Sequence, residues 1–190
     1  VSQMGYILFG IASYSLLGVS GSMFHYISHG TAKGILFMAA GAIILQTEGL
    51  RSIKKMGGLA SKMPLTATAA LIGFLAIMGT PPLNGFQSEW MLFTGVVQEG
   101  IKDAIEYGSL TKILIASLGI VSTAITAGYG LWTIRRVFFG PRPEYLDHVK
   151  EAPPLITVPL ITLAVLTVLL GVYPRIVTDI LLPAIEAIVV

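Results

Sequence analysis

The sequence contains no cysteine. Without thiols the chain cannot form a disulfide, an iron–sulfur cluster or a thiolate metal site. The commonest protein ligands of redox cofactors are therefore absent, and no phosphate-binding glycine loop or nucleophile motif is present either. We expect this chain to bind no cofactor and no metal of its own.

Charge is also scarce. Only 12% of the 190 residues are charged, whereas soluble domains average about 25%. Hydrophobic residues make up 54% of the chain, and its mean hydropathy is +0.81. Because no water-soluble fold of this size could bury so much apolar surface, we expect a lipid bilayer as its solvent. The formal net charge of +2 is too small to indicate nucleic-acid binding.

Apolar segments of membrane-spanning length follow one another along the chain. A hydrocarbon core about 30 Å thick requires about 20 apolar residues per helix. The segments that meet this length are residues 4–24, 25–46, 64–80, 110–134 and 155–172. The fold class is therefore all-α, a polytopic transmembrane helix bundle.

A further apolar stretch, residues 86–98, is too short for a full span. It follows the run GTPPLNG (79–85), in which two prolines and two glycines interrupt a regular helix. Irregular backbone at membrane depth persists only where protein or a watery cavity surrounds it. We expect either a re-entrant turn or half of a broken helix here, next to something functional.

The two basic connections, residues 47–63 and 135–153, bear on the topology. If residues 86–98 cross the membrane, these connections lie on opposite sides. If that stretch only re-enters, both lie on one side, and the residues alone slightly favour this second arrangement.

The chain begins with Val1 inside an apolar run without a charged region or cleavage site, so we expect no signal peptide and a fragment of a longer protein.

The run HYISHGTAKGILF carries the first group of candidate functional residues. His25, His29 and Lys33 recur every four residues, a spacing that places them on one helix face over about 12 Å. An ionisable residue in a bilayer costs about 2.5–3.5 kcal/mol and usually marks an ion path. Burial disfavours the charged form of lysine, so Lys33 would exchange a proton, with the histidines as relay neighbours.

Plainer interpretations of these three residues remain open. His25 begins its predicted segment and suits a membrane interface equally well, and His29 could simply hydrogen-bond a neighbouring helix. Lys33 could extend to the interface, although apolar or small residues separate it from both segment ends. Zinc binding by the histidine pair is disfavoured, because no glutamate follows the first histidine and Lys33 would repel the cation.

Glu89 is the second candidate. Its neighbours along the chain are large and apolar, and no cation lies within a helical turn. We expect its carboxyl group to be protonated or paired with a base from another helix. The alternative places Glu89 at a membrane interface beside Trp90, a residue type enriched there.

Taken together, these segments resemble the antiporter-like proton-translocating subunits of respiratory complex I, Mrp-type cation/proton antiporters and energy-converting membrane hydrogenases. The resemblance covers essentially the whole chain. The strings that carry it, in chain order, are VSQMGY, HYISHGTAKGILFMAAGAI, IKKMGGLASKMP, GTPPLNGFQSEWMLF and RRVFFGPRP.

The resemblance implies that residues 1–190 are the C-terminal part of a single transmembrane domain of about fourteen helices, without a soluble domain. This part would be the second half of an inverted-repeat transporter fold, with about six spans and one broken helix. Lys33 would be the channel lysine, His25 and His29 relay residues, and Glu89 the charge on the broken helix, where many members have lysine. Residues 86–98 would then cross the membrane, and the loop 135–153 would face the cytoplasm.

The implied function is proton translocation by a subunit of a redox-driven complex, similar to an energy-converting hydrogenase or an NADH or F420H2 dehydrogenase. The redox centres and electron partners would lie in other membrane-complex subunits, in a prokaryotic inner membrane, so whether this chain is itself an enzyme stays open. One alternative is an Mrp-type sodium/proton antiporter subunit, with Glu89 at a cation site. The other is a structural membrane subunit that does not pump.

Overall fold

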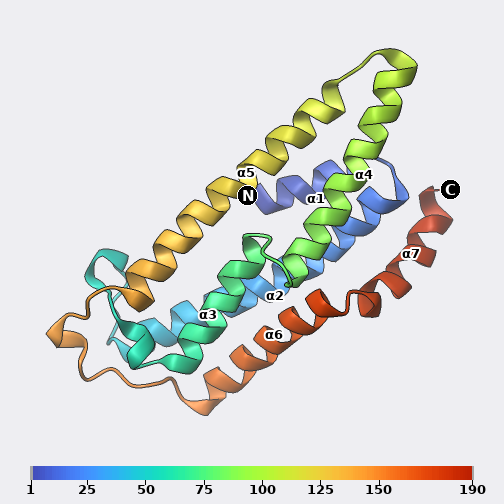
Figure 1. Ribbon diagram of the computed structural model, residues 1–190. Helices are drawn as coiled ribbons and strands as arrows, with labels where there is room; N and C mark the ends of the chain where they lie inside the picture. Colours follow the sequence, from blue (N-terminus) through green and yellow to red (C-terminus); the bar gives the residue numbers. More distant parts are fainter. Residues whose placement is uncertain (1, 190) are drawn as a thin grey trace.

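The computed structural model describes residues 2–189, and within that range every regular element is a helix (Figure 1). The main helices are α1 (Ser2–Ala12), α2 (Leu16–Gln46), α3 (Pro64–Ile77), α4 (Asn84–Tyr107), α5 (Thr111–Ile134), α6 (Pro154–Val172) and α7 (Arg175–Val189). Short turns of helix are η1 (Ile53–Lys55), η2 (Leu59–Ser61), η3 (Arg135–Phe139) and η4 (Glu144–Leu146). The predicted all-α class is confirmed.

The first helix break lies earlier than predicted. The expected boundary between residues 24 and 25 is wrong, because α1 ends at Ala12 and α2 starts at Leu16. Tyr14 has a positive φ of 54°, and the Ser15 side chain caps α2 by accepting a hydrogen bond from Gly18 N at 3.0 Å. As a result His25 lies inside one continuous helix of 31 residues and not at a helix end.

The predicted broken helix is confirmed, and α3 and α4 form its two halves. In Figure 1, α3 runs from one end of the bundle to its middle, where α4 begins and continues to the other end. Residues 78–83 join them, and Gly79 in this turn has a φ of +64°. Beyond the predicted stretch 86–98, α4 continues to Tyr107; Lys102 and Glu99 form an ion pair within this part of α4 (2.6 Å), and Asp103 pairs with Lys112 of α5 (2.9 Å).

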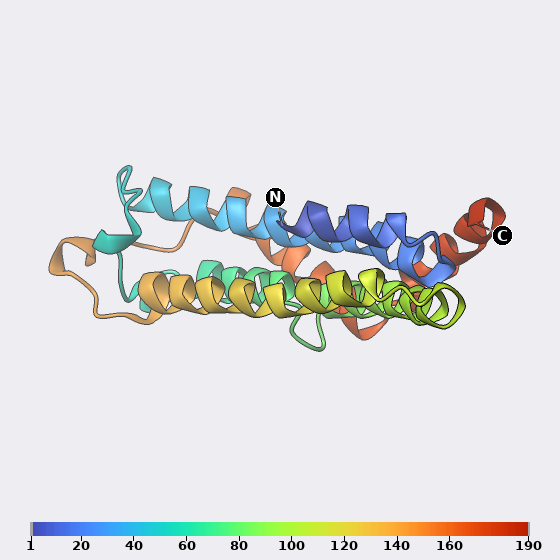
Figure 2. The same cartoon turned by 90° about the horizontal axis from the view of Figure 1, so that it is seen from above.

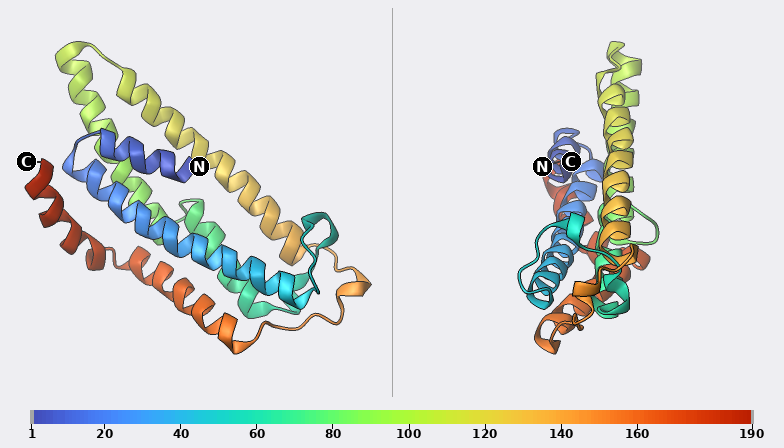
Figure 3. Two further views of the ribbon diagram at one scale, coloured as in Figure 1. Left: turned by 180° about the vertical axis from the view of Figure 1, so that it is seen from behind. Right: turned by 90° about the vertical axis from the view of Figure 1, so that its left-hand side faces the viewer.

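The two basic loops meet at one end of the bundle (Figure 3). Lys62 Nζ donates to Asp147 O at 2.8 Å, Arg142 Nη1 donates to Ser61 Oγ at 2.7 Å, and Arg136 donates to a carbonyl of the first loop. The two loops therefore lie at the same end, as the residues alone favoured, but residues 86–98 do not re-enter: they belong to α4, which continues to the other end of the bundle. The resemblance implied that residues 86–98 cross the membrane separately. This expectation is wrong, because a separate crossing would place the two loops at opposite ends of the bundle.

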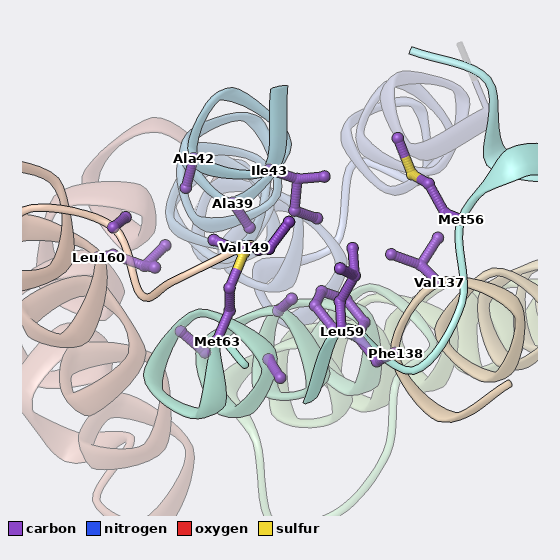
Figure 4. Packing of buried hydrophobic residues seen from close by; sticks show 14 of the residues in the cluster. Ala39, Ala42, Ile43, Met56, Leu59, Met63, Val137, Phe138, Val149 and Leu160 are labelled. Carbon is purple, nitrogen blue, oxygen red and sulfur yellow. The ribbon is translucent and has the colours of Figure 1, made fainter. Parts of the chain in front are cut away.

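Apolar side chains from both loops fill the space beneath them (Figure 4). Ala39 and Ile43 of α2, Met56 and Phe138 of the loops and Leu160 of α6 are all buried in one cluster. The loops therefore pack as part of the core and close this end of the bundle.

Helix α2 is the centre of the molecule and contacts α1, α3, α4, α6 and α7. Seen from above, α1 and α2 form one layer and α3, α4 and α5 another (Figure 2). The layers approach closely at glycines, since a Cβ at Gly21 would overlap the Leu92 backbone and one at Gly95 would overlap that of Gly18. Small residues of this kind let membrane helices touch backbone to backbone.

Among residues 2–189, three helices are long and apolar enough to cross a membrane by themselves: Leu16–Gln46, Thr111–Phe139 and Pro154–Val172. Large apolar side chains such as Phe37, Leu118 and Leu155 are exposed on the outside of the bundle, as lipid contact requires. The predicted count of about six spans is not confirmed by these helices. Helix α7 is not among the predicted segments, because it has only 15 residues and polar ones interrupt its short apolar runs.

Candidate functional site

His25 lies at the junction of α1, α2 and α4 and is only 2% exposed. Its Nδ1 is 2.9 Å from Ser88 Oγ of α4, and its Nε2 is 2.6 Å from Gln3 Oε1 of α1. Both ring nitrogens are therefore hydrogen-bonded to side chains of neighbouring helices. A buried, doubly bonded histidine in mid-helix does not fit the interfacial alternative.

The hydrogen bonds continue beyond the ring. Gln3 Nε2 donates to Ile77 O at 3.3 Å, and Ser88 Oγ can donate to Gly85 O at 2.9 Å. Tyr6 of α1 packs edge-on against the His25 ring at 6.2 Å between centroids. This network ties α1 and α2 to both sides of the helix break.

His29 and Lys33 lie on the same face of α2 as His25, because the helix is continuous through all three. Both side chains are half-buried. Within residues 2–189 neither side chain has a hydrogen-bond or ion-pair partner, so the predicted row of three is present as a helix face and not as a bonded chain.

A second polar cluster lies one helical turn beyond His25. Ser28 Oγ donates to Asn84 O at 3.2 Å, and Asn84 Nδ2 donates to Thr31 Oγ1 at 3.1 Å. Asn84 is fully buried, and its Oδ1 has no partner among the described residues. The cluster therefore places an open hydrogen-bond acceptor at the start of α4, beside the stretch of α2 between His25 and Lys33.

Glu89 is 7% exposed, which does not fit the interfacial alternative. Its Oε2 lies against Gly79 of the helix break, where a Cβ would overlap it, and its Oε1 has no partner within the described chain. It borders a cavity of about 380 Å³ that is otherwise mainly apolar, with Phe93 and Thr94 among its lining residues. No base pairs with this carboxyl group within residues 2–189.

The prediction from sequence missed Gln3, Ser88 and Asn84. Ser88 and Asn84 carried a signal, since Ser88 is a polar residue in the apolar stretch that holds Glu89 and Asn84 lies in the interrupted run just before it. Gln3 carried a weaker signal, because its partner His25 is revealed only by the tertiary contact of α1 with α2. Among residues 2–189, no three His, Asp or Glu side chains come together as a set of metal ligands.

Fold and site together define a helical membrane protein in which buried polar and ionisable side chains surround a broken helix. The chain belongs to the NADH:quinone oxidoreductase/Mrp antiporter transmembrane family, which matches residues 1–131.

Curated relatives match almost the whole chain. It is 38% identical to F(420)H(2) dehydrogenase subunit M of Methanosarcina mazei, over 100% of this chain and 36% of that protein. It is 34% identical to NAD(P)H-quinone oxidoreductase chain 4 of Prochlorococcus marinus, over 100% and 33% respectively. A Na(+)/H(+) antiporter protein of Alkalihalophilus pseudofirmus is 35% identical, over 99% of this chain and 25% of its own length. The chain thus spans about a third or less of these relatives.

Solved structures agree with the fold. A chain of the membrane-bound sulfane sulfur reductase, an archaeal respiratory membrane complex, matches 90% of this chain and 26% of its own with a TM-score of 0.77 and 34% identity. A chain of respiratory complex I from Thermus thermophilus matches 98% of this chain and 37% of its own with a TM-score of 0.83 and 28% identity.

Proposed function

We propose that this chain carries part of a proton path across a prokaryotic cell membrane, as the C-terminal part of one antiporter-like domain in a longer protein. The observation that carries the proposal is His25, buried in mid-helix with both ring nitrogens hydrogen-bonded. A titratable group kept there at an energetic cost usually serves proton or ion transfer.

The proposed path follows α2 and then reaches the helix break. Lys33 and His29 continue the face of His25 over about 12 Å, and the open hydrogen-bond acceptor Asn84 Oδ1 lies beside that stretch. Ser88 connects His25 to α4, the helix that carries Glu89 at the cavity. Gaps between these groups would be filled by water, which transfers protons between neighbouring side chains.

The energy source would be a redox reaction in other subunits. The names of the relatives, a dehydrogenase, a quinone oxidoreductase and a sulfane sulfur reductase, support this partner class. A charge that appears on a neighbouring subunit changes the proton affinity of a poorly screened buried group. The proton path would therefore respond to electron transfer without holding a redox centre.

Lys33→Ala and Glu89→Gln test the proposal in the full-length protein, reconstituted in liposomes with the subunits that co-purify with it. Proton uptake should fall by about 100-fold or more, the usual contribution of a proton-transferring side chain. Lys54→Ala, at an exposed loop lysine, is the control and should pump normally. If both variants assemble and pump at the wild-type rate, the path is wrong; if only assembly fails, the structural alternative is favoured.

A sodium/proton antiporter subunit is the second candidate. It is favoured by the unpartnered Glu89 Oε1 beside a cavity and by the Na(+)/H(+) antiporter protein among the relatives. Sodium-dependent proton flux in the same liposomes distinguishes the two, since a purely redox-driven proton subunit should show none.

A further inference from the structure

The orientation of the Gln3 amide determines which nitrogen of His25 carries hydrogen. The carbonyl of Ile77 can only accept, so the amide nitrogen of Gln3 must face it at 3.3 Å. Oε1 then faces His25 Nε2 at 2.6 Å and can only accept as well. Nε2 must therefore be protonated in the neutral and in the charged ring alike.

This leaves Nδ1 as the nitrogen that can change its protonation, and Ser88 is its partner at 2.9 Å. The Ser88 hydroxyl has two acceptors within reach, Nδ1 and the Gly85 carbonyl at 2.9 Å. When the ring is neutral, the hydroxyl donates to Nδ1. When the ring is charged, Nδ1 donates to Oγ and the hydroxyl donates to the Gly85 carbonyl. His25 and Ser88 therefore keep their hydrogen bonds in both protonation states of the ring.

We propose, on the basis of the proton path above, that Ser88 is the residue through which His25 gains and loses its proton, and that Gln3 is a positioning residue that confines this exchange to Nδ1. In uptake, the Ser88 O–H bond breaks and an Nδ1–H bond forms, while Oγ takes a replacement proton from protonated water. The new hydroxyl hydrogen then points to the Gly85 carbonyl. Release is the reverse.

This arrangement confines proton exchange to one side of the His25 ring. An amide cannot readily pass a proton on, so Gln3 closes the α1 side of the ring, and exchange takes place on the α4 side. The titratable groups around His25 are Tyr6 of α1, His29 on α2 and Glu89, which follows Ser88 on α4. Protons would therefore enter and leave His25 through Ser88, and those that come along α2 from His29 would also pass this hydroxyl before they reach Glu89.

The test compares Ser88→Ala with Ser88→Thr, which keeps a hydroxyl, in the full-length protein with its co-purifying subunits in liposomes. Loss of the hydroxyl leaves Nδ1 without a partner and should lower proton flux by about tenfold, whereas threonine should stay within about twofold of the wild type. A merely structural serine would leave flux per assembled complex unchanged, and that result would overturn the proposal.

Ring nitrogen NMR of histidine-labelled wild-type protein, assigned with His25→Asn, supplies a readout that does not depend on folding of the serine variants. Neutral His25 should carry its hydrogen on Nε2, and Gln3→Met should release this restriction. Hydrogen on Nδ1 in the wild type would contradict the proposal. Because Lys33→Ala tests the path itself, normal flux in Ser88→Ala with loss of flux in Lys33→Ala would refute only the role of Ser88.

Discussion

Gly79 shows how one residue without a side chain positions a buried acid. Its φ of +64° lies in the left-handed region that favours glycine, and the space where a Cβ would stand is occupied by Glu89 Oε2. The turn between α3 and α4 therefore fits around the carboxyl group. The position of the Glu89 carboxyl group therefore depends on Gly79, a residue that hydropathy and charge patterns do not mark as important.

Gly79→Ala should strain the backbone by about 1–2 kcal/mol and also displace the Glu89 carboxyl group, so proton flux should fall. Gly108→Ala is the matched control, because Gly108 has a φ of +68° but no atom within reach of an added Cβ. Both variants should lose similar stability in thermal unfolding of the purified protein, and only Gly79→Ala should lose flux. Equal flux in the two would show that the position of Glu89 does not matter.

At the scale of helices, hydropathy predicted best where a segment is uniformly apolar. Residues 110–134 and 155–172 agree within a residue with α5 and α6. The break before α2 was missed because Ser13 and Ser15 hardly lower the hydropathy of their segment. Hydropathy does not reveal the extension of α4, because its charged residues resemble a loop, although they form one ion pair along the helix and another with α5.

The candidate site also contains residues that the sequence predicts and residues that it does not. His25, His29, Lys33 and Glu89 could be selected from sequence because ionisable residues are conspicuous among apolar ones. The partners of His25 could not be, since they depend on how closely α1, α2 and α4 approach at their glycines. How closely two helices approach is a tertiary property, and it cannot be predicted from the periodicity of either helix.

The contact of α2 with α4 can be tested with two glycines of the same helix. Gly21→Ala should destabilise the protein by about 1–3 kcal/mol, because the new methyl group overlaps the Leu92 backbone. Gly41→Ala meets no atom and should stabilise α2 by up to about 1 kcal/mol through helix propensity. Unfolding of both variants in detergent measures the difference, and a similar change in the two would argue against the close contact.

For the whole molecule, one loop carboxylate connects the closed end to the start of α3. Glu151 Oε2 accepts a hydrogen bond from Leu65 N at 2.7 Å, and Oε1 accepts from Thr66 Oγ1 at 2.6 Å. These bonds satisfy the first turn of α3, for which Met63 provides no side-chain cap. The loop after α5 thereby holds the start of the broken helix.

Glu151→Ala should therefore lower the free energy of unfolding by about 1–2 kcal/mol, as loss of a helix cap does. Glu144→Ala is the control in the same loop, since Glu144 is exposed and its side chain makes no hydrogen bond within residues 2–189. Thermal unfolding and protease cleavage of the loop would measure the effect. An unchanged midpoint for Glu151→Ala would mean that water replaces the carboxylate.

The meeting of α3 and α4 in the middle of the bundle also has an electrostatic consequence. A helix carries roughly half a positive charge at its first turn and half a negative charge at its last. The last turn of α3 and the first turn of α4 lie at the same depth, separated only by residues 78–83. The two partial charges cancel at a distance but act strongly nearby. The break thus supplies local polarity inside the membrane without the cost of a net charge.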